Sequence, residues 1–115
     1  YGPEHLLLLR TLARLRRLIV HAAGVPDSWV GVASHFLART DSEGNGGGKP
    51  NVHCDEASVE RFHFSGVLWL TGGDEAEGGA ISFWDGNRGE WRTSVPTAVG
   101  RSVVFSSGWE NIHQV

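Results

Sequence analysis

Cysteine is nearly absent from this sequence, and methionine is absent altogether. The single cysteine, Cys54, excludes an internal disulfide and a Cys-rich zinc site, because both need more than one thiol. No apolar run reaches roughly 18 residues, so no membrane span is expected within the chain. The chain also has no excess of positive charge: its formal net charge is −3, which gives no electrostatic reason to expect a nucleic-acid partner.

The overall composition is that of an ordinary globular protein. Hydrophobic residues make up 40% and charged residues 20% of the 115 positions, and this length suits one domain with a single core. The chain starts at Tyr1, contains no methionine and stops shortly after His113. We therefore expect it to be a fragment of a longer protein.

Residues 3–23 have the pattern of an amphipathic helix. The apolar residues that recur at spacings of three and four are Leu8, Leu12, Leu15, Ile19 and Ala22. Pro3 and Glu4 suit the first turn of a helix, and Gly24 suits its C-terminal end. Arginines recur on another face of the helix, where a solvated surface is favoured over a membrane or phosphate contact.

After this helix the sequence favours β-structure. Residues 29–38 are expected to form a strand that packs on the helix, and the polar, glycine-rich residues 41–50 a loop. Short apolar segments separated by glycine, asparagine and proline follow. The strands predicted from them are 51–55, 62–71, 79–84, 90–93, 101–106 and 111–115. The expected class is mainly β with a supporting N-terminal helix, arranged as a sandwich or barrel.

Three residues have the chemistry of a metal site. In a strand, residues two apart point to the same side, so His53 and Asp55 should face one way and Cys54 the other. A later predicted strand contributes His113. Two imidazoles and one carboxylate that leave coordination positions open are typical of non-haem Fe(II) oxygenases. His-x-Asp alone is a weak signal, since a surface His–Asp pair and a core histidine would give the same pattern.

Three blocks of sequence strengthen this interpretation. They are His53-x-Asp55, then Gly66–Leu70 with Glu77–Phe83, then Gly100–Gly108 with Asn111–Val115. In this order and spacing they resemble the prolyl 4-hydroxylase-like group of 2-oxoglutarate- and Fe(II)-dependent oxygenases. The resemblance covers residues 51–115, while residues 1–50 are only compatible with it.

The resemblance implies a double-stranded β-helix, that is, a jelly-roll or cupin-like fold. Residues 1–115 would be a single dioxygenase domain, with 1–50 as supporting helix, strand and loop and 51–115 as the β-helix core. Its last strand would be missing from this fragment. Carried over to this chain, the family's iron ligands are His53, Asp55 and His113. Trp69 stands where the family often has a tyrosine that contacts 2-oxoglutarate. Asn111, two residues before His113, is a further candidate for binding the cofactor or supporting the site, and capping of the strand end is the alternative for it.

The activity implied by the resemblance is hydroxylation coupled to conversion of 2-oxoglutarate to succinate and CO₂. Its cofactor is Fe(II), its co-substrates are 2-oxoglutarate and O₂, and ascorbate is expected to keep the iron reduced. The expected partner is a protein or peptide whose side chain is hydroxylated. The family's basic residue that pairs with 2-oxoglutarate lies about ten positions beyond the distal histidine, which is past Val115. The residues give no compartment, although the family is compatible with an endoplasmic reticulum or membrane-anchored location.

Two other readings stay open. The chain could be a catalytically inactive barrel of the same fold that binds a metal or a partner. It could also be a cupin-like metalloenzyme that does not use 2-oxoglutarate. Succinate formation separates both from the dioxygenase.

Overall fold

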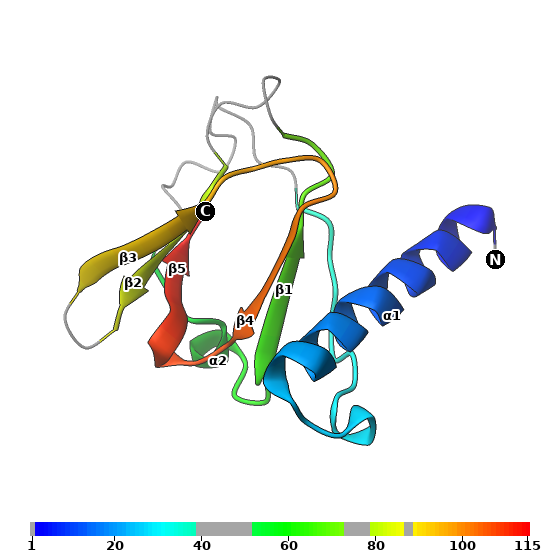
Figure 1. Ribbon diagram of the computed structural model, residues 1–115, viewed down its shortest axis with the longest axis horizontal. Coiled ribbons are helices and arrows are strands. Elements are labelled where there is room, and N and C mark those ends of the chain that lie inside the picture. The colour runs from blue at the N-terminus through cyan, green and yellow to red at the C-terminus, as the bar shows by residue number, and fades with distance from the viewer. Residues whose placement is uncertain (1, 39–51, 73–78, 87–88) are drawn as a thin grey trace. The chain divides into compact units, whose positions relative to one another are not determined.

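The computed structural model describes residues 2–38, 52–72, 79–86 and 89–115, and Figure 1 shows their helices and strands. The chain divides into two compact units, Tyr1–Phe36 and Leu37–Val115. The predicted loop 41–50 lies outside the described residues. Within them, no helix is both long and apolar enough to cross a membrane.

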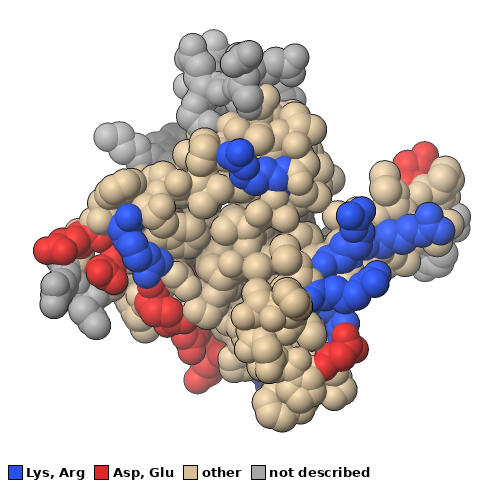
Figure 2. Space-filling model, viewed as in Figure 1, with Lys and Arg blue, Asp and Glu red and all other residues tan. Residues whose placement is uncertain are grey.

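The first unit is dominated by one long helix. Helix α1 spans Pro3–Ala23 and confirms the prediction for this segment. Pro3 lies in the first turn, where its missing N–H removes no helical hydrogen bond. At the other end Gly24 adopts a left-handed conformation (φ 66°) and donates its N–H to the Val20 carbonyl, which ends the helix. Figure 2 shows basic side chains gathered over this helix.

The segment after α1 is not the strand that we expected over 29–38. A 3₁₀ turn, η1, spans Asp27–Trp29, and none of residues 30–38 is in a strand. A side chain, not a second strand, bonds this backbone: Arg16 Nε donates to the Val30 carbonyl at 2.6 Å. The Arg16 guanidinium also donates hydrogen bonds of 2.9 and 2.8 Å to the Asp27 carboxylate, and this hydrogen bonding lowers the pKa of Asp27.

In the described residues of the second unit there are five short strands and two short helical turns. Their bounds are α2 Asp55–Ser58, β1 Phe64–Leu68, β2 Ile81–Asp85, β3 Glu90–Val95, β4 Ser102–Ser106, η3 Trp109–Asn111 and β5 Ile112–Gln114. Five of the predicted strands are therefore present. Four of those are longer in the prediction than in the structure at one or both ends. The sixth, 51–55, is wrong as a strand: of its described residues only His53 forms a bridge, and Asp55 begins helix α2.

The strands form two small antiparallel sheets. One pairs β1 with β4, and the other has the order β3-β2-β5. Phe83 of β2 and Phe105 of β4 meet edge to face with ring centroids 5.1 Å apart, which brings the two sheets together. Ile81 and Phe83 are among the few buried apolar side chains. The described chain is thus mixed α/β, and its two sheets do not close into a barrel.

One glycine of this unit is held tightly between backbone segments. A Cβ on Gly72 would lie 2.7 Å from the Ala98 nitrogen and 2.9 Å from the Thr97 carbonyl carbon. Gly72→Ala is therefore expected to lower the free energy of unfolding by about 1–3 kcal/mol, measured by urea denaturation. Gly66→Ala is the control, since its Cβ would meet Val104 Cγ1 at an ordinary 3.5 Å. Equal urea midpoints for the two variants would contradict the expected clash.

Candidate metal centre

His53 and His113 are brought together by backbone pairing. The N–H of His53 donates to the His113 carbonyl at 3.0 Å, and the N–H of His113 donates to the His53 carbonyl at 2.8 Å. Residues that exchange both bonds in an antiparallel pair carry their side chains on the same face of the sheet. The two imidazole rings accordingly lie 4.6 Å apart between centroids.

β5 places His113 between two neighbours on that face. On its other side His113 pairs with Phe83 of β2, so that Phe83, His113 and His53 form a row across the strands. Phe105 contacts the His113 ring from the other sheet at 4.9 Å between centroids. His113 is therefore fixed by aromatic packing as well as by backbone hydrogen bonds.

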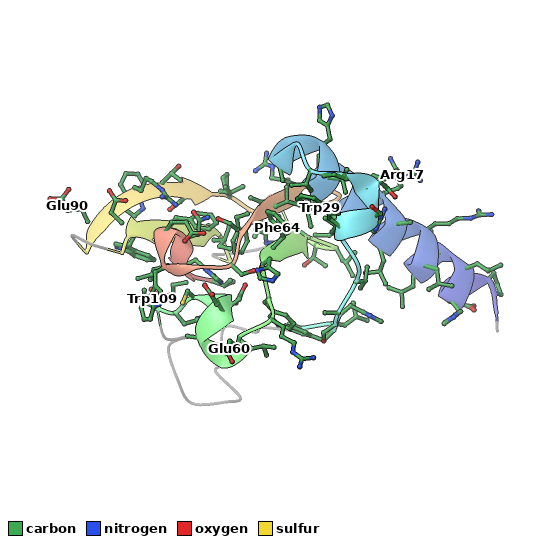
Figure 3. All side chains as sticks on the ribbon, turned by 90° about the horizontal axis from the view of Figure 1, so that it is seen from below. Arg17, Trp29, Glu60, Phe64, Glu90 and Trp109 are labelled. Atoms are coloured by element: carbon green, nitrogen blue, oxygen red, sulfur yellow. The ribbon has the colours of Figure 1, made fainter. Side chains whose placement is uncertain are left out.

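Asp55 reaches the same place through a turn. Cys54 is buried, and the chain enters helix α2 at Asp55 directly after it. The backbone N–H of Glu56 donates to the Ser107 carbonyl at 3.0 Å, which ties the start of α2 to the chain beyond β4. In Figure 3 the label Glu60 marks the chain just after α2, and the label Trp109 marks the start of η3.

The three side chains converge on one oxygen. Asp55 Oδ1 lies 3.3 Å from His53 Nε2 and 3.5 Å from His113 Nε2. One donor atom from each residue falls within 4.8 Å of the other two. Donors held about 2.1 Å from one metal ion lie roughly 3.0–3.5 Å apart for octahedral or tetrahedral angles. The geometry is consistent with a metal site.

The donor set also fits a divalent metal chemically. Two neutral imidazoles and one carboxylate supply three ligands with a single negative charge and leave coordination positions open. His53, Asp55 and His113 are thus the residues that could hold the ion. Cys54, the only thiol, is not a member of the group.

Access to the group is one-sided. The His113 side chain is 6% exposed and that of Asp55 26%, whereas 45% of the His53 side chain is exposed. Phe83 and Phe105 cover the His113 side. A small molecule could therefore approach next to His53, while the opposite side excludes water.

A chain of hydrogen bonds supports His113 from behind. Its Nδ1 lies 2.9 Å from the Asn111 carbonyl oxygen, which directs Nε2 toward Asp55. Asn111 Nδ2 donates to the carbonyl and hydroxyl oxygens of Ser106, at 3.1 and 2.9 Å. Arg92 donates to Asn111 Oδ1 at 2.5 Å. Asn111 therefore supports His113 and also ties the turn before β5 to the end of β4.

Next to this chain, the Glu110 carboxylate accepts a hydrogen bond from the Ser106 hydroxyl at 2.5 Å. This bond, with backbone hydrogen bonds from Glu110 and Gly108, lowers the pKa of Glu110. The same bond joins the η3 turn to the end of β4.

Trp69 is not brought into the group. Its indole N–H donates to the Gly79 carbonyl at 3.2 Å. Trp69 follows the end of β1, four positions beyond Ser65, which in an extended chain is roughly 13 Å. The predicted contact of Trp69 with 2-oxoglutarate stays a prediction.

Two residues of the site were not foreseen from the sequence. Ser65 donates to Asp55 Oδ2, and Arg92 bonds Asn111. The alternation of the predicted strand 62–71 places Ser65 on one face with Val67 and Trp69, and this was the only available signal for it. Nothing in the sequence points to Arg92.

Comparison with models of known protein families, with curated proteins and with solved structures gives no significant match for this chain.

Proposed function

We propose that this chain is the metal-binding part of an Fe(II)- and 2-oxoglutarate-dependent dioxygenase that hydroxylates a side chain of a protein or peptide. The observation that supports it most directly is the convergence of His53, Asp55 and His113, with one shielded side and one open side. The net reaction combines R–H, O₂ and 2-oxoglutarate to give R–OH, succinate and CO₂. The order and spacing of the three sequence blocks along the chain also support the proposal.

The fold belonging to this proposal is a double-stranded β-helix, with residues 1–115 in a single domain. Its support is the meeting of two antiparallel sheets through Phe83 and Phe105, with the three donors beside that contact. In this arrangement each histidine is fixed by strand pairing, so the site needs little reorganisation on binding a metal ion.

Each residue then has a defined task. His113, held by Asn111 and two phenylalanines, presents Nε2 in a fixed direction. Asp55 supplies the negative charge, and the more exposed His53 lines the entrance. Iron bound there would supply oxidative decarboxylation of 2-oxoglutarate and hydroxylation of a C–H bond, with ascorbate keeping it reduced.

Succinate formation tests the proposal. The whole protein, of which this chain is proposed as the metal-binding part, should release succinate when supplied with Fe(II), ascorbate, O₂ and 2-oxoglutarate, with faster release when a substrate peptide is present. His53→Ala should reduce turnover to background, because one of the three donors of the group is lost. Ser82→Ala removes a hydroxyl that is bonded to Ser94 and is no metal donor, so this variant should turn over like the wild type.

The other outcomes identify the competing readings. A protein that binds iron but forms no succinate and oxidises nothing is the inactive barrel. Iron-dependent oxidation without succinate indicates the cupin-like enzyme. Unchanged succinate formation by His53→Ala would contradict the proposal that His53 binds the catalytic iron.

A further inference from the structure

The two oxygens of the Asp55 carboxylate have different partners. Oδ1 faces both histidines, at 3.3 Å from His53 Nε2 and 3.5 Å from His113 Nε2. Oδ2 accepts a hydrogen bond of 2.5 Å from the hydroxyl of Ser65. The carboxylate is therefore held so that only one of its oxygens points to the metal group.

The hydroxyl of Ser107 is hydrogen-bonded to the hydroxyl of Ser65. Ser65 Oγ lies 2.8 Å from Ser107 Oγ, and Ser107 is 1% exposed, so water does not compete for this contact. If Ser65 donates its only hydroxyl proton to Asp55, it accepts the proton of Ser107. The hydroxyl chain thus runs in one direction, from Ser107 through Ser65 to the carboxylate.

Both serines are fixed by the β1–β4 sheet. Ser65 pairs with Phe105 across the two strands. Ser107 follows β4, where its N–H donates to the His63 carbonyl at 2.9 Å and its carbonyl accepts from Glu56 at 3.0 Å. These backbone bonds hold the main chain of both serines beside Asp55, and the two hydrogen bonds of Ser65 Oγ set the direction of its hydroxyl.

We propose that Ser65, supported by Ser107, is a positioning residue that restricts Asp55 to coordination through one oxygen. This inference rests on the proposed metal site. A carboxylate free to turn could bind through both oxygens and occupy a position that a chelating co-substrate needs. The Ser65 hydrogen bond to Oδ2 opposes that turn and keeps the position open.

Metal affinity is the first readout. In titration calorimetry with Mn²⁺, Ser65→Ala should bind roughly 10–100-fold more weakly than the wild type, as expected for loss of a partner that supports a ligand. Ser65→Thr keeps the hydroxyl and should restore most of the affinity. Ser82→Ala is the matched control, because Ser82 forms a similar hydroxyl pair with Ser94, at 2.6 Å, on the other sheet.

The coordination mode is the second readout. The visible absorption of bound Co²⁺ should change in Ser65→Ala and stay unchanged in Ser65→Thr and Ser82→Ala. A purely structural role for Ser65 would lower stability without altering that spectrum. Should Ser65→Ala fail to fold, Ser107→Ala is expected to weaken Mn²⁺ binding more than Ser82→Ala does.

The failures are distinguishable. A wild-type protein that binds neither Mn²⁺ nor Co²⁺ contradicts the metal site itself. A wild type that binds both, with Ser65→Ala matching Ser82→Ala in affinity and spectrum, overturns the role of Ser65 and leaves the metal site standing.

Discussion

Replacing Asp55 by alanine is expected to weaken Mn²⁺ or Fe²⁺ binding by at least about 100-fold, more than loss of a supporting hydrogen bond. The change removes the only anionic donor of the group and leaves two neutral imidazoles. It also leaves Ser65 without its acceptor, so the remaining site is less ordered. Titration calorimetry at one pH and ionic strength measures the loss.

Asp85→Ala is the matched control for this variant. It makes the same change in side chain and net charge at an exposed position outside the group, where Asp85 lies 4.0 Å from Arg92. A bound ion stabilises the folded state, so a chelator should lower the melting temperature of the wild type and of Asp85→Ala. It should have no such effect on Asp55→Ala. Equal dissociation constants for the two variants would exclude Asp55 as a ligand.

Phe83→Ala is expected to have the largest effect on stability, a loss of about 3–5 kcal/mol of unfolding free energy. Phe83 is 4% exposed, and it contacts Phe105 in the other sheet and the ring of His113. Its removal leaves a cavity where the two sheets meet. Urea denaturation followed by circular dichroism measures the loss.

An aromatic residue on the neighbouring strand serves as the control for Phe83. Trp91 of β3 is 61% exposed, so Trp91→Ala leaves no buried cavity and should change the free energy of unfolding by about 1 kcal/mol or less. Since Phe83 also packs on His113, Phe83→Ala should weaken Mn²⁺ binding while Trp91→Ala should not. If both variants unfold at the same urea concentration, the core does not lie at Phe83.

Local patterns predicted helix α1 and the five strands of this chain, but not always their ends. Helix α1 followed from its apolar spacing together with Pro3 and Gly24, which are signals within the element itself. The strand predicted over 62–71 is present only at Phe64–Leu68, because a strand ends where its partner does. The strand expected over 29–38 is wrong for a similar reason: Arg16 bonds the Val30 carbonyl and no strand pairs there.

The sequence singled out the candidate metal ligands through an argument that was partly wrong. His53 and His113 lie in paired backbone, as the predicted strands required. Asp55 was expected to share a face with His53 through strand alternation, yet it begins α2. Acidic residues are favoured at a helix N-terminus, and both Asp55 and Glu56 stand there. The structure brings together the three residues that the sequence singled out, although the conformation between them is different.

The support around the group depends on distant pairings that local patterns do not contain. Ser65 reaches Asp55 only because β1 pairs with β4 in one register, and a shift by one residue would turn its side chain to the other face. Arg92 reaches Asn111 from another strand. Neither residue type is unusual for its position, so both could be identified only from the three-dimensional structure.

The reciprocal hydrogen bonds between His53 and His113 join residues about 60 positions apart, and contacts at such separations form slowly because a long loop must close first. During folding, the full set of ligands therefore does not exist until the C-terminal strand has reached the first histidine. Metal uptake then reports completion of this tertiary structure and not the formation of any local segment. In a refolding experiment, high-affinity Mn²⁺ binding should appear together with the slowest phase that builds β5.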